Sequence, residues 1–177
     1  MPANIEIKAF LKNRNAALAT AARLADSGPE VIHQEDIFFP CDGARLKLRI
    51  FDTDHDPEYG ELIRYERDDL AEVRRSRYSI ARTSDPGTLL EILRRTLGVT
   101  GTVKKTRTLY LVGQTRIHID QVEGLGDFLE LEVVLRKDQT EESGKHIANR
   151  LLSQFGIDSP DLIAEAYIDL LGARKTA

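Results

Sequence analysis

Four short segments of the chain alternate polar or charged residues with apolar ones. They cover residues 4–8, 45–49, 116–120 and 130–132. Because successive side chains of a β-strand point to opposite faces, each segment predicts a strand with one charged and one apolar face. The last segment is acidic, the second is basic, and the first carries one acid and one base, Glu6 and Lys8. If the charged faces meet inside a barrel, they line a cavity that suits a divalent metal ion holding a polyphosphate.

Apolar runs elsewhere extend the pattern to about eight strands. The predicted strands cover residues 4–12, 31–39, 45–51, 61–67, 77–82, 101–112, 115–122 and 127–134. Gly113 and Gln114 predict a two-residue hairpin turn between two of them.

Cap residues and amphipathic stretches predict up to four helices. They cover residues 15–25, 86–98, 140–155 and 160–171, with caps at Asn15, Asp85, Thr140 and Ser159. Together the elements predict one antiparallel α+β domain over residues 1–172, followed by a short tail at 173–177. The amphipathic helices are expected to cover the apolar faces of the strands.

Composition narrows the class of protein. The chain has 177 residues, of which 41% are hydrophobic and 31% charged, as in a soluble globular domain. Its net charge of -4 argues against a nucleic-acid partner, whereas local basic clusters suit a small anion.

Cys41 stands alone, which excludes an intrachain disulfide and a Cys-x-x-Cys metal site. Without an apolar run of about 20 residues or a signal peptide, we expect a cytoplasmic monomer or homodimer with no membrane partner.

The acidic strand residues are candidates for a metal site. Mg²⁺ typically takes one or two carboxylates together with substrate phosphates and water, which Glu6, Glu130 and Glu132 could supply. The same alternation is also typical of a solvated sheet face. Asp120 is a candidate metal ligand or a residue that supports the ligands from behind, or a solvated residue at a hairpin end. His118 is expected to be a polar strand residue rather than a metal ligand.

The basic strand residues are candidates for binding an anion. Arg45, Lys47 and Arg49 place three like charges on one strand face, and a polyanion would relieve their repulsion because guanidinium groups match phosphate oxygens. Charges on an edge strand that discourage aggregation are the alternative.

Further basic residues leave two questions open. Lys105 and Arg107 share one face of their strand. Arg64 and Arg67 lie on opposite faces of theirs, and the sequence does not show which of these two faces points inward. Lys8 could bind phosphate or act as a base, or it could form a simple ion pair with Glu6. The chain contains no Walker loop, G-x-S-x-G or G-x-G-x-x-G motif.

The order of these motifs resembles the CYTH superfamily of triphosphate tunnel metalloenzymes. The motifs are E-x-K at 6–8, R-x-K-x-R at 45–49, L-I-x-Y-x-R at 62–67, K-x-R-x-L-Y at 105–110, T-R-I-H-I-D-x-V-E-G-L-G-x-F-L-E-L-E at 115–132 and A-Y-I-D-L-L at 166–171. The resemblance covers nearly the whole chain. It implies an eight-stranded antiparallel closed β-barrel that forms a tunnel with flanking helices. Carboxylates on its first and last strands would hold one or two Mg²⁺ or Mn²⁺.

The resemblance also implies roles for individual residues. The metal ligands would be Glu6, Glu130 and Glu132, with Asp120 nearby. The catalytic residues would be Glu6 and Lys8. The triphosphate ligands would be Lys8, Lys47, Arg49, Lys105 and Arg107, with Arg64 or Arg67 from the fourth strand and Arg45 and Arg116 as further candidates.

Two departures from the family pattern affect these expectations. The family signature is E-x-E-x-K, but position 4 is Asn, which removes a negative charge from the metal site. Some relatives place a tyrosine where this chain has Phe38 and Phe39, so any help from that hydroxyl is absent.

Three functions therefore remain open. The first is a metal-dependent triphosphatase acting on inorganic tripolyphosphate, thiamine triphosphate or a nucleoside triphosphate. The second is a class IV adenylyl cyclase, which makes cyclic AMP and pyrophosphate from ATP. The third is a weakly catalytic polyphosphate- or nucleotide-binding module. Hydrolysis is favoured because the sequence shows no obvious pocket for a purine.

Overall fold

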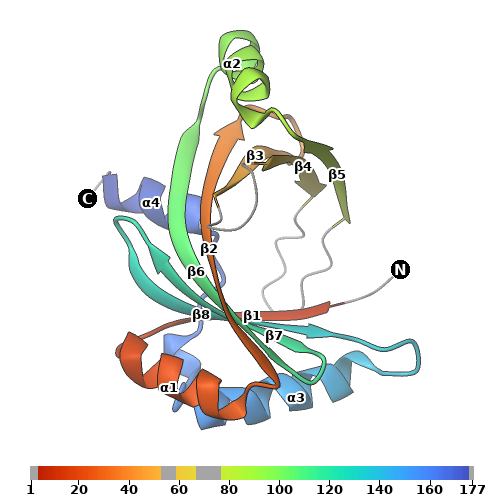
Figure 1. Ribbon diagram of the computed structural model, residues 1–177, viewed down its shortest axis with the longest axis vertical. Coiled ribbons are helices and arrows are strands. Elements are labelled where there is room, and N and C mark those ends of the chain that lie inside the picture. Colours follow the sequence, from red (N-terminus) through yellow and green to blue (C-terminus); the bar gives the residue numbers. More distant parts are fainter. Residues whose placement is uncertain (1–3, 53–58, 67–76, 176–177) are drawn as a thin grey trace.

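The computed structural model describes residues 4–52, 59–66 and 77–175, in which eight strands form one antiparallel sheet (Figure 1). The strands are β1 (Asn4–Phe10), β2 (Ser27–Phe39), β3 (Arg45–Asp52), β4 (Tyr59–Glu66), β5 (Arg77–Thr83), β6 (Gly101–Val112), β7 (Thr115–Val122) and β8 (Gly126–Val134). Their spatial order is β1-β8-β7-β6-β2-β3-β4-β5. The first strand in the chain therefore pairs with the last one.

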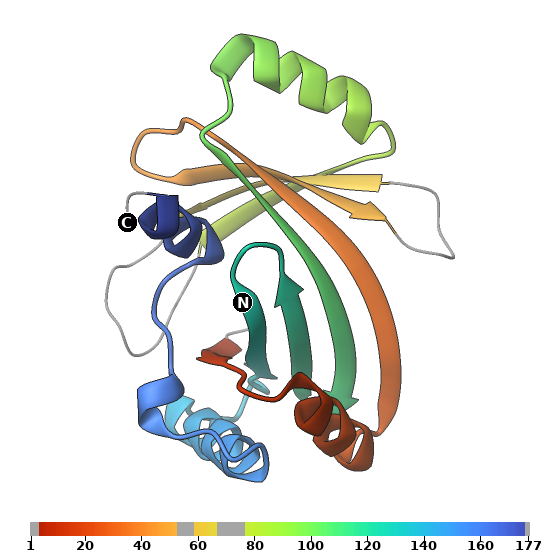
Figure 2. The same cartoon turned by 90° about the vertical axis from the view of Figure 1, so that its left-hand side faces the viewer.

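The sheet is strongly curved, because the long strands β2 and β6 bend from one end of the molecule to the other (Figure 2). Within the described residues no ladder joins the two edge strands, β1 and β5. The prediction of eight antiparallel strands is confirmed, whereas the predicted closure into a barrel is not seen in this part of the chain.

Two groups of helices cover the convex face of the sheet. The helices α1 (Arg14–Leu24) and α3 (Glu141–Gln154) lie at one end and α2 (Pro86–Leu97) lies at the other (Figure 2). Ile117, Ile119, Leu129 and Leu131 of β7 and β8 pack in one core cluster with residues of α1 and α3. A separate cluster places the leucines of α2 against β2 and β3. The apolar strand face is thus covered, and the charged face is left on the concave side.

The cap of the first helix differs from the prediction. Asn13, not Asn15, is its N-cap, and its side chain accepts a hydrogen bond from the Ala16 backbone N–H at 3.0 Å. The preceding strand ends at Phe10, two residues earlier than predicted. Both asparagines can cap a helix, so residue type alone did not distinguish them.

The predicted helix over residues 160–171 is wrong. Residues Ser159–Asp161 form a single 3-10 turn, and α4 (Tyr167–Lys175) begins only after an extended stretch. In that stretch Leu162 pairs with Ala9, and the Ile163 N–H donates to the Lys8 carbonyl at 2.9 Å. The outer edge of β1 therefore holds the chain in an extended form, because an unpaired edge offers hydrogen bonds that a local helix would forgo.

Candidate functional site

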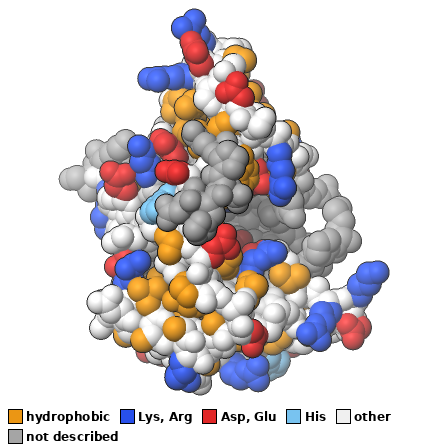
Figure 3. All heavy atoms as spheres, in the orientation of Figure 1, with side chains coloured by type: hydrophobic (Ala, Val, Ile, Leu, Met, Phe, Trp, Pro, Cys, Tyr) orange, Lys and Arg blue, Asp and Glu red, His pale blue; other side chains and the backbone are white. Residues whose placement is uncertain are grey.

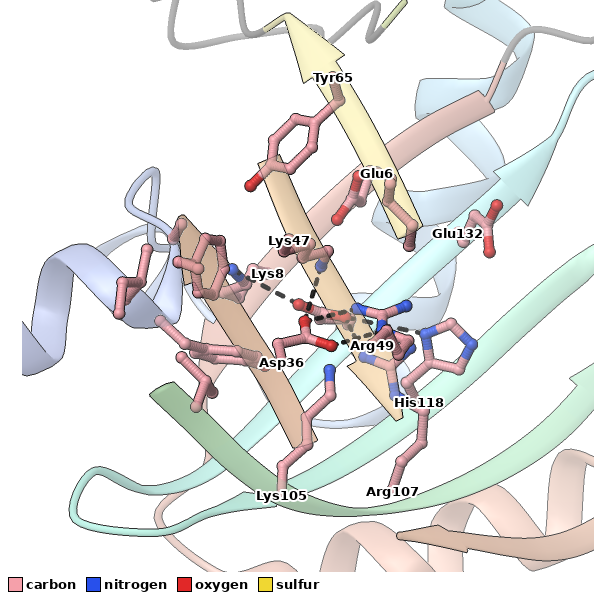
Figure 4. A pocket seen from close by; sticks show the side chains of 17 residues that line it. Glu6, Lys8, Asp36, Lys47, Arg49, Tyr65, Lys105, Arg107, His118 and Glu132 are labelled. Atoms are coloured by element: carbon pink, nitrogen blue, oxygen red, sulfur yellow. Dashed lines mark hydrogen bonds and ion pairs between the residues drawn. The ribbon is translucent and has the colours of Figure 1, made fainter. Parts of the chain in front are cut away.

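A cavity of about 320 Å³ lies on the concave side of the sheet. Figure 3 shows acidic and basic side chains near the middle of one face of the molecule. Side chains from β1, β2, β3, β4, β6, β7, β8 and α4 line the cavity (Figure 4). Its charged lining residues are Glu6, Lys8, Asp36, Lys47, Arg49, Lys105, Arg107, Glu130 and Glu132. Most of the predicted site residues are therefore brought together.

Asp120 anchors two of the predicted phosphate ligands. It is fully buried, and its carboxylate accepts hydrogen bonds from Lys105 Nζ at 2.9 Å and from Arg107 Nε and Nη2 at 2.7 and 2.6 Å. Burial alone would raise the pKa of Asp120, but the two cations lower it. Asp120 therefore stays ionised and positions cations, and it does not line the cavity in which it was predicted to bind a metal.

Glu130 links the first strand to this cluster. Its carboxylate accepts a hydrogen bond from Arg107 and lies 3.4 Å from Lys8 Nζ. His118 Nδ1 lies 3.8 Å from the same carboxylate. Burial would raise the pKa of Glu130, but the charge of Arg107, with that of Lys105, lowers it well below its usual value.

Asp36 forms a second cluster that the sequence did not indicate. Its carboxylate accepts hydrogen bonds from Lys47 Nζ at 2.6 Å and from Arg49 Nε and Nη2 at 2.6 and 2.8 Å (Figure 4). Burial opposes ionisation of Asp36, yet these two cations lower its pKa far below the usual range. The one sequence feature that could have marked Asp36 is its place as an acid beside the apolar residues at the end of β2. The register then places it opposite Arg49.

The two arginines keep a donor for a ligand. Each uses Nε and Nη2 to hold its carboxylate. Among the described residues, neither Arg49 Nη1 nor Arg107 Nη1 has a hydrogen-bond acceptor, and neither atom is among the fully buried ones. A guanidinium group has five N–H donors, so both arginines can bind a phosphate oxygen without leaving Asp36 or Asp120.

Tyr167 is a second residue that the sequence did not assign to the site. Its hydroxyl donates to Asp120 at 3.1 Å, and Lys8 Nζ lies 4.1 Å from its ring centroid. Lys105 Nζ lies 5.1 Å from the same centroid. Burial raises the pKa of Tyr167, so the hydroxyl remains protonated. The first residue of α4 therefore supports the cations of β1 and β6 from the end of the cavity.

The acidic end of the cavity fits a hard cation. Register places Glu6 opposite Glu132 on neighbouring strands, where two like charges repel each other. Asn4 Nδ2 donates to Glu132 at 2.6 Å, and Asn4 Oδ1 is buried with no hydrogen-bond partner. Two carboxylates and an unsatisfied amide oxygen are donors that Mg²⁺ or Mn²⁺ accepts. In the described ranges no group of three or more acidic, His or Cys residues is close enough to hold a metal ion.

Among the described residues, three predicted arginines do not line the cavity, namely Arg45, Arg64 and Arg116. Arg64 is exposed and pairs with Glu66 at 3.0 Å, because its neighbours in β4, Ile63 and Tyr65, face inward. Arg67 lies outside the described residues. Arg116 is half exposed and pairs with Glu132 at 3.1 Å. Arg45, a further candidate, pairs with Asp169 of α4 at 2.9 Å.

The sequence matches the family model of the CYTH domain over residues 2–167. The chain belongs to the CYTH domain family. Among curated proteins it is 24% identical to one from Methanocaldococcus jannaschii named "Putative adenylate cyclase", over 95% of this chain and 98% of that protein. The CYTH resemblance seen in the sequence is thereby confirmed.

Solved structures agree with the fold. Protein PH1012 of Pyrococcus horikoshii has a TM-score of 0.77 at 24% identity and covers 94% of this chain and 98% of its own. A Hippeastrum protein described as a "Putative adenylyl cyclase" with "a dominant triphophatase activity" has a TM-score of 0.66 at 16% identity, over 99% of this chain and 96% of that one.

No helix in the described part of the chain is both long and apolar enough to cross a membrane.

Proposed function

We propose that this CYTH protein is a divalent-metal-dependent phosphohydrolase that acts on a triphosphate held on the concave side of its sheet. The observation that supports this most is the convergence of five cations on one cavity, namely Lys8, Lys47, Arg49, Lys105 and Arg107. Buried carboxylates hold them in place before any ligand arrives, so they need little reorganisation when phosphate charge develops.

The charges of the cavity nearly balance in the absence of a ligand. Five cations and four carboxylates line it. A triphosphate therefore needs additional positive charge. Mg²⁺ or Mn²⁺ bound by Glu6 and Glu132, with the Asn4 amide oxygen, would neutralise charge on the transferring and leaving phosphates.

The side chains suggest how the reaction would run. Arg49 and Arg107 would bind phosphate oxygens through Nη1, while Lys47 and Lys105 bind the neighbouring oxygens. A water oriented by Glu6 or Lys8 would attack the terminal phosphorus. The bond from that phosphorus to the bridging oxygen then breaks, the diphosphate leaves with the bonding electrons, and the water proton passes to Glu6 or to the released phosphate.

A class IV adenylyl cyclase is the second candidate. The name of the M. jannaschii relative favours it, whereas the activity stated for the Hippeastrum protein favours hydrolysis. In a cyclase the ribose 3′-OH would attack the α-phosphorus of ATP and pyrophosphate would leave. A weakly catalytic binding module is the third candidate, suggested by Asn4 in place of glutamate and by Phe38 and Phe39.

A product assay separates the three candidates. The purified protein is incubated with Mg²⁺ or Mn²⁺ and with ATP, tripolyphosphate or thiamine triphosphate, and phosphate, pyrophosphate and cyclic AMP are quantified. Phosphate release is expected, and Arg107→Met should abolish it. Cyclic AMP with equal pyrophosphate would establish a cyclase instead. Triphosphate binding without any product would leave the binding module, and no binding would refute the proposed site.

A further inference from the structure

Glu132, one of the carboxylates proposed to hold the metal ion, has a protein cation beside it. Arg116 Nη1 lies 3.1 Å from each of the two carboxylate oxygens of Glu132. Asn4 Nδ2 donates to one of these oxygens at 2.6 Å. Both oxygens that could bind a metal ion therefore accept hydrogen bonds from the protein itself, and a divalent ion has to compete with these donors.

The strand register keeps Arg116 at this place. Glu132 of β8 lies opposite Glu6 of β1 on one side and opposite Arg116 of β7 on the other. The Cβ atoms of such directly opposite residues are about 4.5–5.5 Å apart, so Glu132 has a like charge on one side and an opposite charge on the other. Arg116 offsets the repulsion between the two carboxylates, and a divalent ion bound between them would do the same.

Arg116 is held much less firmly than the cations of the phosphate site. The buried carboxylate of Asp120 holds Lys105 and Arg107, whereas the Arg116 side chain is 50% exposed and does not line the cavity. An exposed ion pair contributes little to stability because water replaces the contact when it breaks. The Arg116 side chain can therefore turn to the solvent without disturbing the sheet.

The two partners of Glu132 respond differently to a metal ion. A guanidinium group and a divalent ion beside one carboxylate repel each other, so Arg116 has to leave when the ion binds. Asn4 can stay, because its Oδ1 atom is buried with no hydrogen-bond partner among the described residues and is itself a suitable metal ligand. Arg116 is thus the partner that exchanges with the metal.

We infer that Arg116 competes with the divalent metal ion for Glu132 and thereby lowers the affinity of the site for the metal. This inference rests on the proposed metal-dependent function and adds the regulation of metal binding to it. The sequence made Arg116 a further candidate for binding the triphosphate. Its contact with Glu132 instead makes it a positioning residue, which keeps the two carboxylates together without a metal and yields to the ion when one binds.

Titration with Mn²⁺, followed by the spin-resonance signal of the free ion, measures the competition directly. Arg116→Met should bind Mn²⁺ about fivefold more tightly than the unmodified protein, which is the upper range for an exposed ion pair. Arg116→Lys keeps a competing charge and should stay within about twofold. Arg64→Met is the matched control, because Arg64 is 48% exposed and pairs with Glu66 at 3.0 Å away from the cavity. It should leave the affinity unchanged.

Thermal unfolding distinguishes competition from a purely structural ion pair. After metal chelation, Arg116→Met should melt about 2–4 °C below the unmodified protein, because Glu6 and Glu132 then repel each other without compensation. At saturating Mn²⁺ the difference should vanish, because the ion has displaced Arg116 from the unmodified protein as well. A structural ion pair that does not compete would give the same loss with and without Mn²⁺.

The outcomes separate this inference from the function on which it rests. Unchanged or weaker Mn²⁺ binding by Arg116→Met, or an equal loss of melting temperature in both conditions, would overturn the competition. Calorimetric titration with Mg²⁺ and the imido analogue of tripolyphosphate, in which NH replaces the bridging oxygens, tests the site separately. If the unmodified protein binds Mn²⁺ and the analogue, only the inference fails. If it binds neither, the proposed function fails with it.

Discussion

Triphosphate binding is expected to weaken as the pH rises through 8, because Lys47 loses its proton there. Burial and the neighbouring charge of Arg49 lower the pKa of Lys47 to about 8, although the Asp36 carboxylate opposes them. A polyanion beside the ammonium group stabilises its charged form. Binding therefore raises this pKa and takes up a proton, so affinity is highest below pH 8 and is lost above it.

The size of the effect follows from the fraction of Lys47 that is charged. With a pKa of about 8, roughly nine tenths of the free protein carries the charge at pH 7 and roughly one tenth at pH 9. If only the charged form binds, affinity falls about tenfold over this range, which is about 1.4 kcal/mol. Ionisation of the ligand does not mimic this fall, because the loss of a proton makes the ligand more negative and would strengthen its binding to the cations.

Titration of the imido analogue of tripolyphosphate at pH 7, 8 and 9 measures the effect. Lys47→Arg is the matched control, because a guanidinium group stays charged throughout this range, and its affinity should change less than threefold. A wild-type affinity that does not vary with pH would refute the reasoning, as would an equal fall in Lys47→Arg.

Substitutions at three further residues test other parts of the site. Asp120→Asn should lower the free energy of unfolding by about 3–5 kcal/mol, because two buried cations lose their carboxylate; a loss under about 1 kcal/mol in urea unfolding would contradict the buried ion cluster. Tyr167→Phe should cost about 1 kcal/mol for one hydrogen bond and Tyr167→Leu more, because the ring is also lost; equal costs would remove the role of the ring. Asn4→Glu should tighten Mn²⁺ binding about tenfold by adding a carboxylate ligand beside Glu132; an unchanged affinity in a spin-resonance titration would place Asn4 outside the metal site.

The strands and most of their charged residues could be predicted because alternation has a physical cause. A strand with one face in a core and one in a charged cavity must alternate, so the pattern around Lys47 and Glu130 identified both the strand and the face. Where alternation put candidates on both faces, as with Arg64 and Arg67, the sequence could not choose. The structure shows that the Arg64 side chain lies on the face of β4 that points to the solvent.

The residues that the sequence missed depend on contacts between distant segments. Asp36 lies at the apolar end of β2, and nothing in its local sequence indicates its partners on the neighbouring strand. Tyr167 sits in an ordinary apolar helix pattern, and its role follows from the extended stretch that places α4 at the end of the cavity. That stretch was predicted as helix from the local cap signal at Ser159. It is extended instead because Leu162 and Ile163 pair with β1, more than 150 residues earlier in the chain.

The pairing of β1 with β8 has a consequence for how the protein is made. Lys8 leaves the ribosome roughly 120 residues before its partner Glu130, a delay of about 6–25 s at typical rates of synthesis. During this time β1 has no strand beside it, while β2, β3, β4 and β5 can already pair in succession. Glu6 and Lys8 of β1, which face the cavity in the folded protein, are charges that disfavour pairing of the unpaired strand with other nascent chains. We therefore expect the residues proposed to bind metal and phosphate also to protect the unfinished chain from such pairing.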